Sequence, residues 1–315
     1  MGTDMTRRRL LVSSAAGLGC FAAALSKADV FKTKLQKAVI RKSPTEDELK
    51  KIKDAGFDGI EAYTVPVDEA AKLRELAEKL GLRIHSVMGG GSAAGLRAAQ
   101  AYGADAVLYV PGGVSGVAMP EPWDLDIAFD EKTGHLTRVV AGDNAKFQAY
   151  IEAHNRSMDG ARESIKRLIP IAEETKVVIA LENVWNNFNV RPELLRWLAS
   201  SFQSPWVKVY FDIGNHIKYA AAMRDGKLQV LYPPEVWIRT FGPLLAKIHV
   251  KDYRLNDDLR GGAWARIGDG TANWPAVRQA LDEVGYSGWL TDETGLGLTE
   301  LSRRLDQIIA GQPVR

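Results

Sequence analysis

Four apolar, strand-like segments of the sequence each carry an acid or an imidazole at or close to their end. The four residues are Glu182, Asp212, His249 and Glu293. If the segments are neighbouring strands of one barrel, their ends bring these side chains together. Three carboxylates and one imidazole suit Mn²⁺ or Mg²⁺, with Co²⁺ and Zn²⁺ as alternatives. The pattern therefore predicts a site for one divalent metal ion.

Such a site would perform proton chemistry next to a carbonyl group. A metal ion bound by two oxygens of a hydroxy-ketone polarises the carbonyl and lowers the pKa of the adjacent C–H or O–H. Glu182 and Glu293, approaching from opposite sides, can each keep one oxygen free for proton transfer. One would remove a proton from carbon and the other would return a proton to the opposite face. For either residue alone, the alternative is an ion-paired loop carboxylate.

Further residues near the strand ends are candidates for contacts with the substrate. Lys251 follows His249 by two residues, so it points to the same side if the strand continues. It then either steadies an enediolate oxygen or forms an ion pair with Asp252. Trp185, in the loop after Glu182, could stack on a sugar face, although tryptophan is often a core residue.

Three weaker candidates complete this set. His216, four residues after Asp212, either contacts substrate or metal or caps the start of a helix. Glu61 and His85 end the second and third expected strands and could reach the substrate. For His85, a core position is the alternative.

Strand-like and helix-like segments alternate along the whole chain. Thr45 is expected to cap the first helix, with Glu48 in its first turn. Eight strands alternating with helices predict an α/β fold, a single-domain (β/α)8 TIM barrel. A doubly wound open sheet is the alternative, but it gives no reason for ligands at four successive strand ends. The expected strands are 37–40, 59–63, 82–87, 106–110, 178–182, 207–211, 246–250 and 289–291, and the expected helices are 44–55, 68–80, 93–102, 145–175, 192–200, 234–241, 274–284 and 298–309.

Two segments are too long for plain connections between a strand and a helix. They are residues 112–143 and 253–271. Long loops after barrel strands are usually lids or specificity elements. The second segment follows His249 directly and is expected to overhang the site, whereas a surface insertion is the alternative for the first.

Residues 1–26 have the composition of an export signal. An arginine triplet at 7–9 forms a twin-arginine pattern, followed by an apolar run and small residues. The run is shorter than the ~20 residues of a membrane-spanning helix. We therefore expect export to the periplasm and a mature barrel, 27–315, without a membrane span. A retained anchor or a lipid on Cys20 is the alternative.

Composition restricts the partners and the ligands. The net charge of +2 predicts no polyanionic partner, and 46% hydrophobic residues are enough for one large core. Cys20 is the only cysteine. A mature chain without it holds metal through oxygen and nitrogen alone.

An ordered set of short motifs resembles the xylose-isomerase-like superfamily of sugar isomerases and epimerases. This superfamily includes keto-sugar 3-epimerases, hydroxypyruvate isomerases, inosose dehydratases and apurinic-site endonucleases. In its epimerase branch, a Glu, an Asp, a His and a second Glu hold one divalent ion, and the resemblance assigns these roles to the same four residues. The motifs are Leu-Glu-Asn at 181–183, Asp-Ile-Gly-Asn-His at 212–216, Ile-His-Val-Lys-Asp at 248–252, Gly-Asp-Gly at 268–270 and Gly-Tyr-Ser-Gly-Trp at 285–289.

Departures from the family narrow the expected function. Asn215 and Phe188 stand where free-ketohexose epimerases usually carry a substrate His and an acid, so a simple ketohexose is not the expected substrate. Five histidines cannot supply the zinc ligands of the endonuclease branch, and we expect no nucleic acid. The predicted function is a metal-dependent isomerase or epimerase of a small sugar or keto-sugar, monomeric or homodimeric. A lyase of the inosose-dehydratase or keto-glycoside type and a non-catalytic sugar-binding protein are the alternatives.

Overall fold

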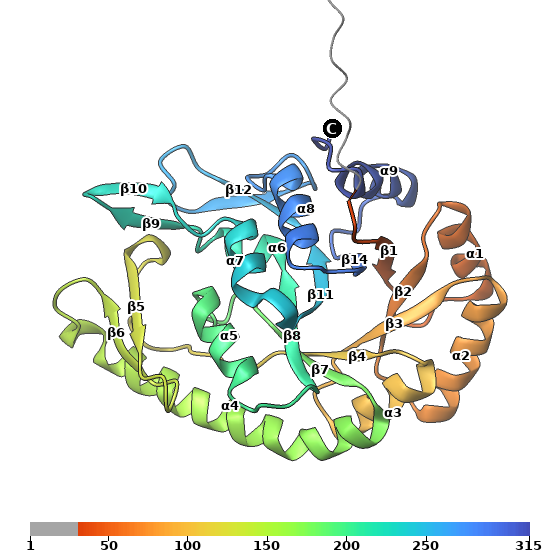
Figure 1. Ribbon diagram of the computed structural model, residues 1–315, viewed down its shortest axis with the longest axis horizontal. Coiled ribbons are helices and arrows are strands. Elements are labelled where there is room, and N and C mark those ends of the chain that lie inside the picture. The colour runs from red at the N-terminus through yellow and green to blue at the C-terminus, as the bar shows by residue number, and fades with distance from the viewer. Residues whose placement is uncertain (1–30) are drawn as a thin grey trace, which may run out of the picture. The chain divides into compact units, whose positions relative to one another are not determined.

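Eight parallel strands close into a barrel in the computed structural model of the protein, which describes residues 31–315 (Figure 1). Around the barrel the order is β1-β14-β11-β8-β7-β4-β3-β2. This confirms the predicted TIM barrel over an open sheet. The predicted export signal, residues 1–26, lies outside the described residues. The barrel strands are β1 (Leu35–Ile40), β2 (Gly59–Tyr63), β3 (Arg83–Met88), β4 (Ala106–Tyr109), β7 (Val178–Glu182), β8 (Val207–Asp212), β11 (Leu245–Val250) and β14 (Gly288–Asp292).

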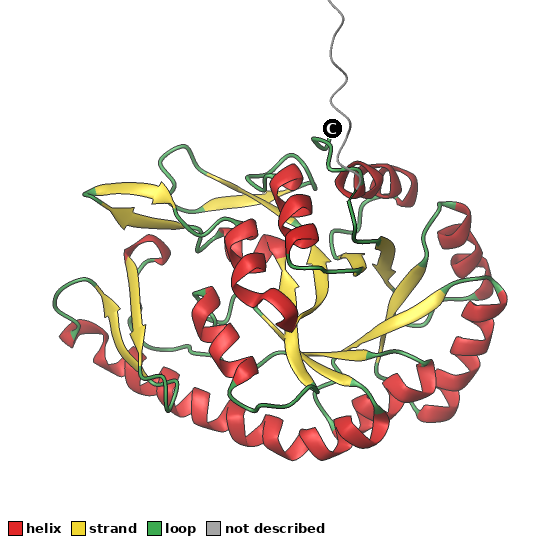
Figure 2. Cartoon of the chain, in the orientation of Figure 1, coloured by secondary structure: helices red, strands yellow, loops and turns green. Residues whose placement is uncertain are grey.

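Helices surround the barrel, as Figure 2 shows in red. Thr45 caps the first helix and Glu48 lies in its first turn, as predicted. The Thr45 hydroxyl accepts from the Glu48 N–H, and the Glu48 side chain accepts from the Thr45 N–H. No helix among residues 31–315 is long and apolar enough to cross a bilayer. The helices are α1 (Glu46–Asp54), α2 (Val67–Lys79), α3 (Ala93–Tyr102), α4 (Gln148–Thr175), α5 (Pro192–Ser200), α6 (Ile213–Ile217), α7 (Pro234–Phe241), α8 (Trp274–Glu283) and α9 (Leu298–Ile309), with short 3₁₀ turns η1 (Pro122–Asp124), η2 (Ala145–Phe147) and η3 (Gly242–Leu244).

Three antiparallel hairpins extend from the barrel. They are β5 (Leu125–Phe129) with β6 (Leu136–Val140), β9 (Ala221–Arg224) with β10 (Lys227–Val230), and β12 (Asp252–Leu255) with β13 (Gly262–Ala265). The first and third lie in the two long segments that we expected to be loops. The second turns at Asp225-Gly226, where both residues have positive φ and suit a two-residue hairpin turn.

The barrel strands separate two apolar regions. Outward-facing side chains pack against the helices in the main core, which includes Val39, Ile60, Val107, Ile179, Phe211, Ile248 and Leu290. Ala106, Leu108, Ala180 and Tyr210 form a small second cluster. Because side chains alternate along a strand, residues 247, 249 and 251 project to the same side of β11 and its extension, opposite to Ile248. This side faces the barrel interior.

Candidate metal centre

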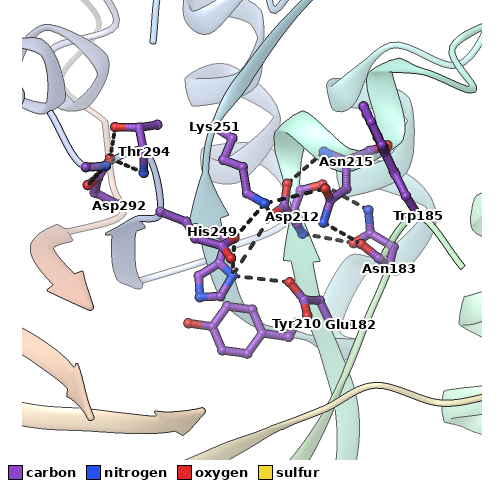
Figure 3. A network of polar contacts seen from close by, with 12 residues as sticks. Glu182, Asn183, Trp185, Tyr210, Asp212, Asn215, His249, Lys251, Asp292 and Thr294 are labelled. Atoms are coloured by element: carbon purple, nitrogen blue, oxygen red, sulfur yellow. Dashed lines mark hydrogen bonds and ion pairs between the residues drawn. The ribbon is translucent and has the colours of Figure 1, made fainter. Parts of the chain in front are cut away.

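The four predicted ligands lie together at the carboxyl end of the barrel, and Figure 3 labels three of them, Glu182, Asp212 and His249. One donor atom from each lies within 4.8 Å of the others. Glu182 and Asp212 are the last residues of β7 and β8, and Glu293 follows β14 directly. In the strand register His249 is opposite Asp212 on one side and Thr291 on the other. Four consecutive barrel neighbours therefore each supply one side chain at the same level.

His249 Nδ1 is surrounded by carboxylate oxygens. It lies 3.2 Å from Glu182 Oε1, 3.3 Å from Glu293 Oε2 and 4.0 Å from Asp212 Oδ2. The Asp212 and His249 side chains are fully buried, whereas 28% of the Glu293 side chain is exposed. One imidazole nitrogen carries at most one proton, so it cannot neutralise three carboxylates. Buried acids in this number require a further cation or protonation.

Lys251 supplies a positive charge at the outer side of the cluster. Its Nζ lies 2.8 Å from Glu293 Oε2 and 3.1 Å from Asp212 Oδ2. The alternative from the sequence was an ion pair between Lys251 and Asp252. Asp252 instead accepts a hydrogen bond from Trp274 Nε1 at 3.1 Å and others from backbone N–H groups. Lys251 therefore belongs to the cluster.

The carboxylates have pKa values that differ in direction. Burial raises the pKa of Asp212 to about 7, even though Lys251 opposes the shift. Burial also raises the pKa of Glu182. At Glu293, burial acts in the same direction, but His249 and Lys251 outweigh it and lower the pKa. Without an added cation the cluster thus keeps its negative charge mainly on Glu293.

His249 experiences the opposite balance. Burial lowers the pKa of its imidazole, but Glu61, Glu182 and Glu293 outweigh burial and raise it well above the usual value. A metal ligand must present a neutral nitrogen, so a cation that binds here displaces a proton from the ring.

The residues fit a divalent cation on two observations. Asp212 Oδ2 and Glu293 Oε2 are buried and form no hydrogen bond of acceptable geometry, although both are at ion-pair distance from Lys251. The donor set of three oxygens and one nitrogen is the kind that Mn²⁺ and Mg²⁺ accept. The candidate ligands would be Glu182, Asp212, His249 and Glu293.

Two asparagines for which the sequence analysis predicted no contact with Asp212 hold this residue in place. The Asn183 side chain accepts from the Asp212 N–H and donates to the Asp212 carbonyl, each at 2.9 Å. Asp212 Oδ1 accepts from the Asn215 N–H at 2.7 Å and so caps α6. The cap occupies one oxygen of Asp212 and leaves Oδ2 to face the cluster. Asn183 follows Glu182 in the Leu-Glu-Asn motif, and this position was the available signal.

Two stacked tryptophans lie beside Lys251. The rings of Trp185 and Trp264 are 4.6 Å apart at 16°, and Tyr253 meets both edge-on. Lys251 Nζ lies 5.1 Å from the Trp264 ring centre. A Cβ on Gly214 would lie 2.5 Å from Lys251 Cβ and 3.1 Å from Trp264, so only glycine fits beneath this contact. Trp264 was not predicted, and its position in the glycine-containing loop after His249 was the only signal.

The remaining predicted residues lie away from the opening of the site. His216 is buried between Phe211 and Trp237, at ring distances of 5.1 and 5.2 Å, and burial lowers its pKa to about 3. Glu61 and His85 are fully buried inside the barrel. Neither is open to a substrate in this structure.

Comparison with known proteins agrees with this architecture. The chain belongs to the xylose isomerase-like TIM barrel family, whose model matches residues 49–305. No curated protein matches the sequence significantly.

Solved structures of similar fold include three with informative descriptions. A D-tagatose 3-epimerase-like protein has 17% identity and a TM-score of 0.60, covering 87% of this chain and 97% of that chain. A xylose isomerase-like TIM barrel protein from Mycobacterium smegmatis, in complex with magnesium, has 18% identity and a TM-score of 0.57, covering 91% and 98%. Mannonate dehydratase from Streptococcus suis has 15% identity and a TM-score of 0.55, covering 82% and 83%. At these identities the likeness shows the fold alone.

Proposed function

We propose that the protein is a divalent-metal-dependent isomerase or epimerase of a small sugar or keto-sugar. The observation that carries this proposal is the placement of two glutamates, Glu182 and Glu293, around the same nitrogen of His249, at 3.2 and 3.3 Å. Both belong to a cluster fit for a cation. Each is therefore close enough to combine metal binding with proton transfer.

The metal would be held by Glu182, Asp212, His249 and Glu293, with Mn²⁺ or Mg²⁺ as the expected ions. When bound, such an ion makes the carbon next to a substrate carbonyl more acidic. The remaining tasks fall to side chains. Glu182 and Glu293 come from strands on either side of the cluster and can serve the two faces of a planar intermediate. Lys251 Nζ lies 2.8 Å from Glu293 and thus beside the cluster. From this position its charge can neutralise negative charge on a substrate oxygen.

Two features bear on the substrate. The exposed parts of Trp185 and Trp264, 36% and 51% of their surfaces, offer the apolar faces on which sugars stack. Phe188 stands where free-ketohexose epimerases usually carry an acid, and it is fully buried against His154. The substrate we propose is therefore a keto-sugar other than a free ketohexose, such as a keto-glycoside. Export of the protein, predicted from residues 1–26, is part of this proposal and would favour a sugar without phosphate.

A lyase is the second candidate. The structural neighbour described as mannonate dehydratase supports it, because dehydration also begins with removal of a proton next to a carbonyl or carboxyl group. The two functions differ in whether a leaving group is present on the next carbon. Only the product can separate them.

The test measures the incorporation of deuterium from D₂O into candidate substrates. NMR follows the reaction of the Mg²⁺-loaded protein, and the products of the Mn²⁺-loaded protein are identified by chemical analysis in parallel. The panel contains keto-sugars, 3-keto-glycosides and inososes. Glu182→Gln and Glu293→Gln are the site variants, and Glu163→Gln, on the exposed surface of α4, is the matched control. We expect deuterium next to the carbonyl with the wild type and the control only.

An epimer or isomer as product would establish the first function, and an eliminated product the second. No exchange from any compound, despite tight metal binding, would favour the non-catalytic sugar-binding alternative. Absence of metal binding would overturn the metal centre itself.

A further inference from the structure

Glu61 is a fully buried carboxylate that the proposed chemistry does not use. It lies on β2, in the half of the barrel that supplies no candidate metal ligand. Three side chains from three other strands contact it. His249 Nε2 lies 2.6 Å and the Tyr210 hydroxyl 3.0 Å from Oε2, and the Ser86 hydroxyl lies 2.9 Å from Oε1.

These contacts define which nitrogen of His249 carries a proton. An ionised carboxylate only accepts hydrogen bonds, and both hydroxyls are placed to donate to it. At 2.6 Å, His249 Nε2 must then donate as well. The other ring nitrogen, Nδ1, is the atom that faces Glu182, Glu293 and Asp212.

We propose that Glu61 is a positioning residue that holds His249 with its proton on Nε2 and its Nδ1 lone pair directed at the metal centre. The inference rests on the proposed metal-dependent function. Carboxylates that accept the second N–H of a metal-binding histidine commonly fix its tautomer and orientation in this way. This role replaces the substrate contact that the sequence suggested for Glu61.

Among residues 31–315, Glu61 is the only hydrogen-bond partner of His249 Nε2. The imidazole is fully buried, and the Tyr210 ring lies 4.4 Å from it. Loss of the acceptor would leave a buried N–H without a hydrogen bond, which is unfavourable. The ring could avoid this cost by moving its proton to Nδ1, which would then no longer bind a cation.

The test compares Mn²⁺ affinity, measured by calorimetry, for Glu61→Met and Glu61→Gln. Methionine keeps the volume but removes the acceptor, and we expect about 10- to 100-fold weaker binding. Glutamine retains a carbonyl oxygen as acceptor, so we expect it to restore most of the affinity. Long-range ¹H–¹⁵N NMR of the Mg²⁺-loaded protein should show the His249 proton on Nε2 in the wild type and in Glu61→Gln.

A milder pair of variants covers the case in which Glu61→Met does not fold. Tyr210→Phe removes one hydrogen bond to Glu61 and should weaken Mn²⁺ binding several-fold. Tyr286→Phe removes another buried hydroxyl, which bonds the backbone of Trp289, and should leave the affinity unchanged.

Two results would overturn the inference and are distinguishable. If the wild type binds no Mn²⁺, the metal centre and the inference fail together. If the wild type binds Mn²⁺ but folded Glu61→Met and Tyr210→Phe bind it equally well, with the same His249 spectrum, Glu61 is structural only and the proposed function stands.

Discussion

Strand β11 and the residue that follows it carry two lysines, one at each end of the barrel. The two lysines have different roles. At the carboxyl end, Lys251 is shared between Asp212 and Glu293. At the amino end, Lys247 pairs with Asp105 at 2.5 Å. That pair lines a cavity of about 540 Å³, together with Arg83 and Lys208. Acids are therefore in excess at one end and bases at the other.

The pKa directions of the two lysines reflect this difference. Burial lowers the pKa of Lys247, and Asp105 only partly opposes it. Burial also acts against the charge of Lys251, but Asp212 and Glu293 outweigh it and raise its pKa. Water stabilises the excess charge at the amino end, because Asp105 and Arg83 are half exposed. The carboxyl end buries more carboxylates than its basic side chains neutralise, so either protonation or a bound cation must compensate them. In TIM barrels the carboxyl end is also where active sites lie.

The largest effect is expected for Asp212→Asn at the carboxyl end. Asparagine can still cap α6 through its carbonyl oxygen but removes one negative charge from the cluster. We expect metal content to fall below detection and proton exchange to fall by about 10³-fold or more. Metal analysis by mass spectrometry and the D₂O assay measure the two effects. Retention of stoichiometric metal by the variant would contradict the assigned ligand set.

Lys251→Met should separate metal binding from catalysis. Removing a positive charge in contact with two ligands should tighten Mn²⁺ binding several-fold. The exchange rate should nevertheless fall by about 10- to 100-fold, because charge on the substrate oxygen loses its partner. Calorimetry and exchange kinetics on the same preparation test this opposition. A parallel fall of both quantities would make Lys251 a structural residue.

A smaller effect is expected for Trp264→Ala in the β12–β13 hairpin. The variant removes the ring that stacks on Trp185 and lies next to Lys251. We expect KM for the substrate found by the exchange assay to rise about tenfold, with kcat within about threefold, because stacking contributes about 1 kcal/mol or more to binding. An unchanged KM would show that the sugar lies elsewhere.

The smallest effect is expected for Lys247→Met at the amino end. Methionine fills a similar volume, and Asp105 remains accessible to water. We expect the free energy of unfolding in urea to change by about 1 kcal/mol or less, because methionine avoids the desolvation of a buried ammonium and the half-exposed Asp105 is not left as a buried unpaired charge. Metal affinity and exchange should stay within about twofold of the wild type. A tenfold change in either quantity would show that the two ends are coupled and would contradict the separate roles of the two lysines.

The barrel was predictable because its signals are local. Alternation of strand-like and helix-like segments predicted all eight barrel strands, and four helices, α3, α5, α7 and α9, have the expected bounds. The three hairpins were missed. For β9–β10 a local signal existed, the Asp225-Gly226 turn, whereas the strands of β5–β6 are irregular in register and lack a clear alternating pattern.

The candidate ligands were predictable from their positions at strand ends, but their surroundings were not. Glu61 and His216 illustrate the limit. Both stand near expected strand ends in the sequence, yet Glu61 lies within β2 and contacts His249, and His216 lies in α6 and packs in an aromatic cluster. Which side chains such a residue contacts depends on parts of the chain that are far away in sequence. Glu61 and its partner His249 are 188 positions apart.

The sequence by itself determined the order of the barrel strands, the family and the four residues that could hold a cation, because hydrophobic periodicity and residue type act over short stretches. Only the tertiary structure decided which nitrogen of His249 faces the carboxylates, that Lys251 joins them, and that Trp264 reaches Trp185. These features depend on closure of the barrel, which places β2 across from β11 and brings the β12–β13 hairpin beside the loop after β7. Contacts between segments so distant in sequence leave no local pattern from which they could be inferred.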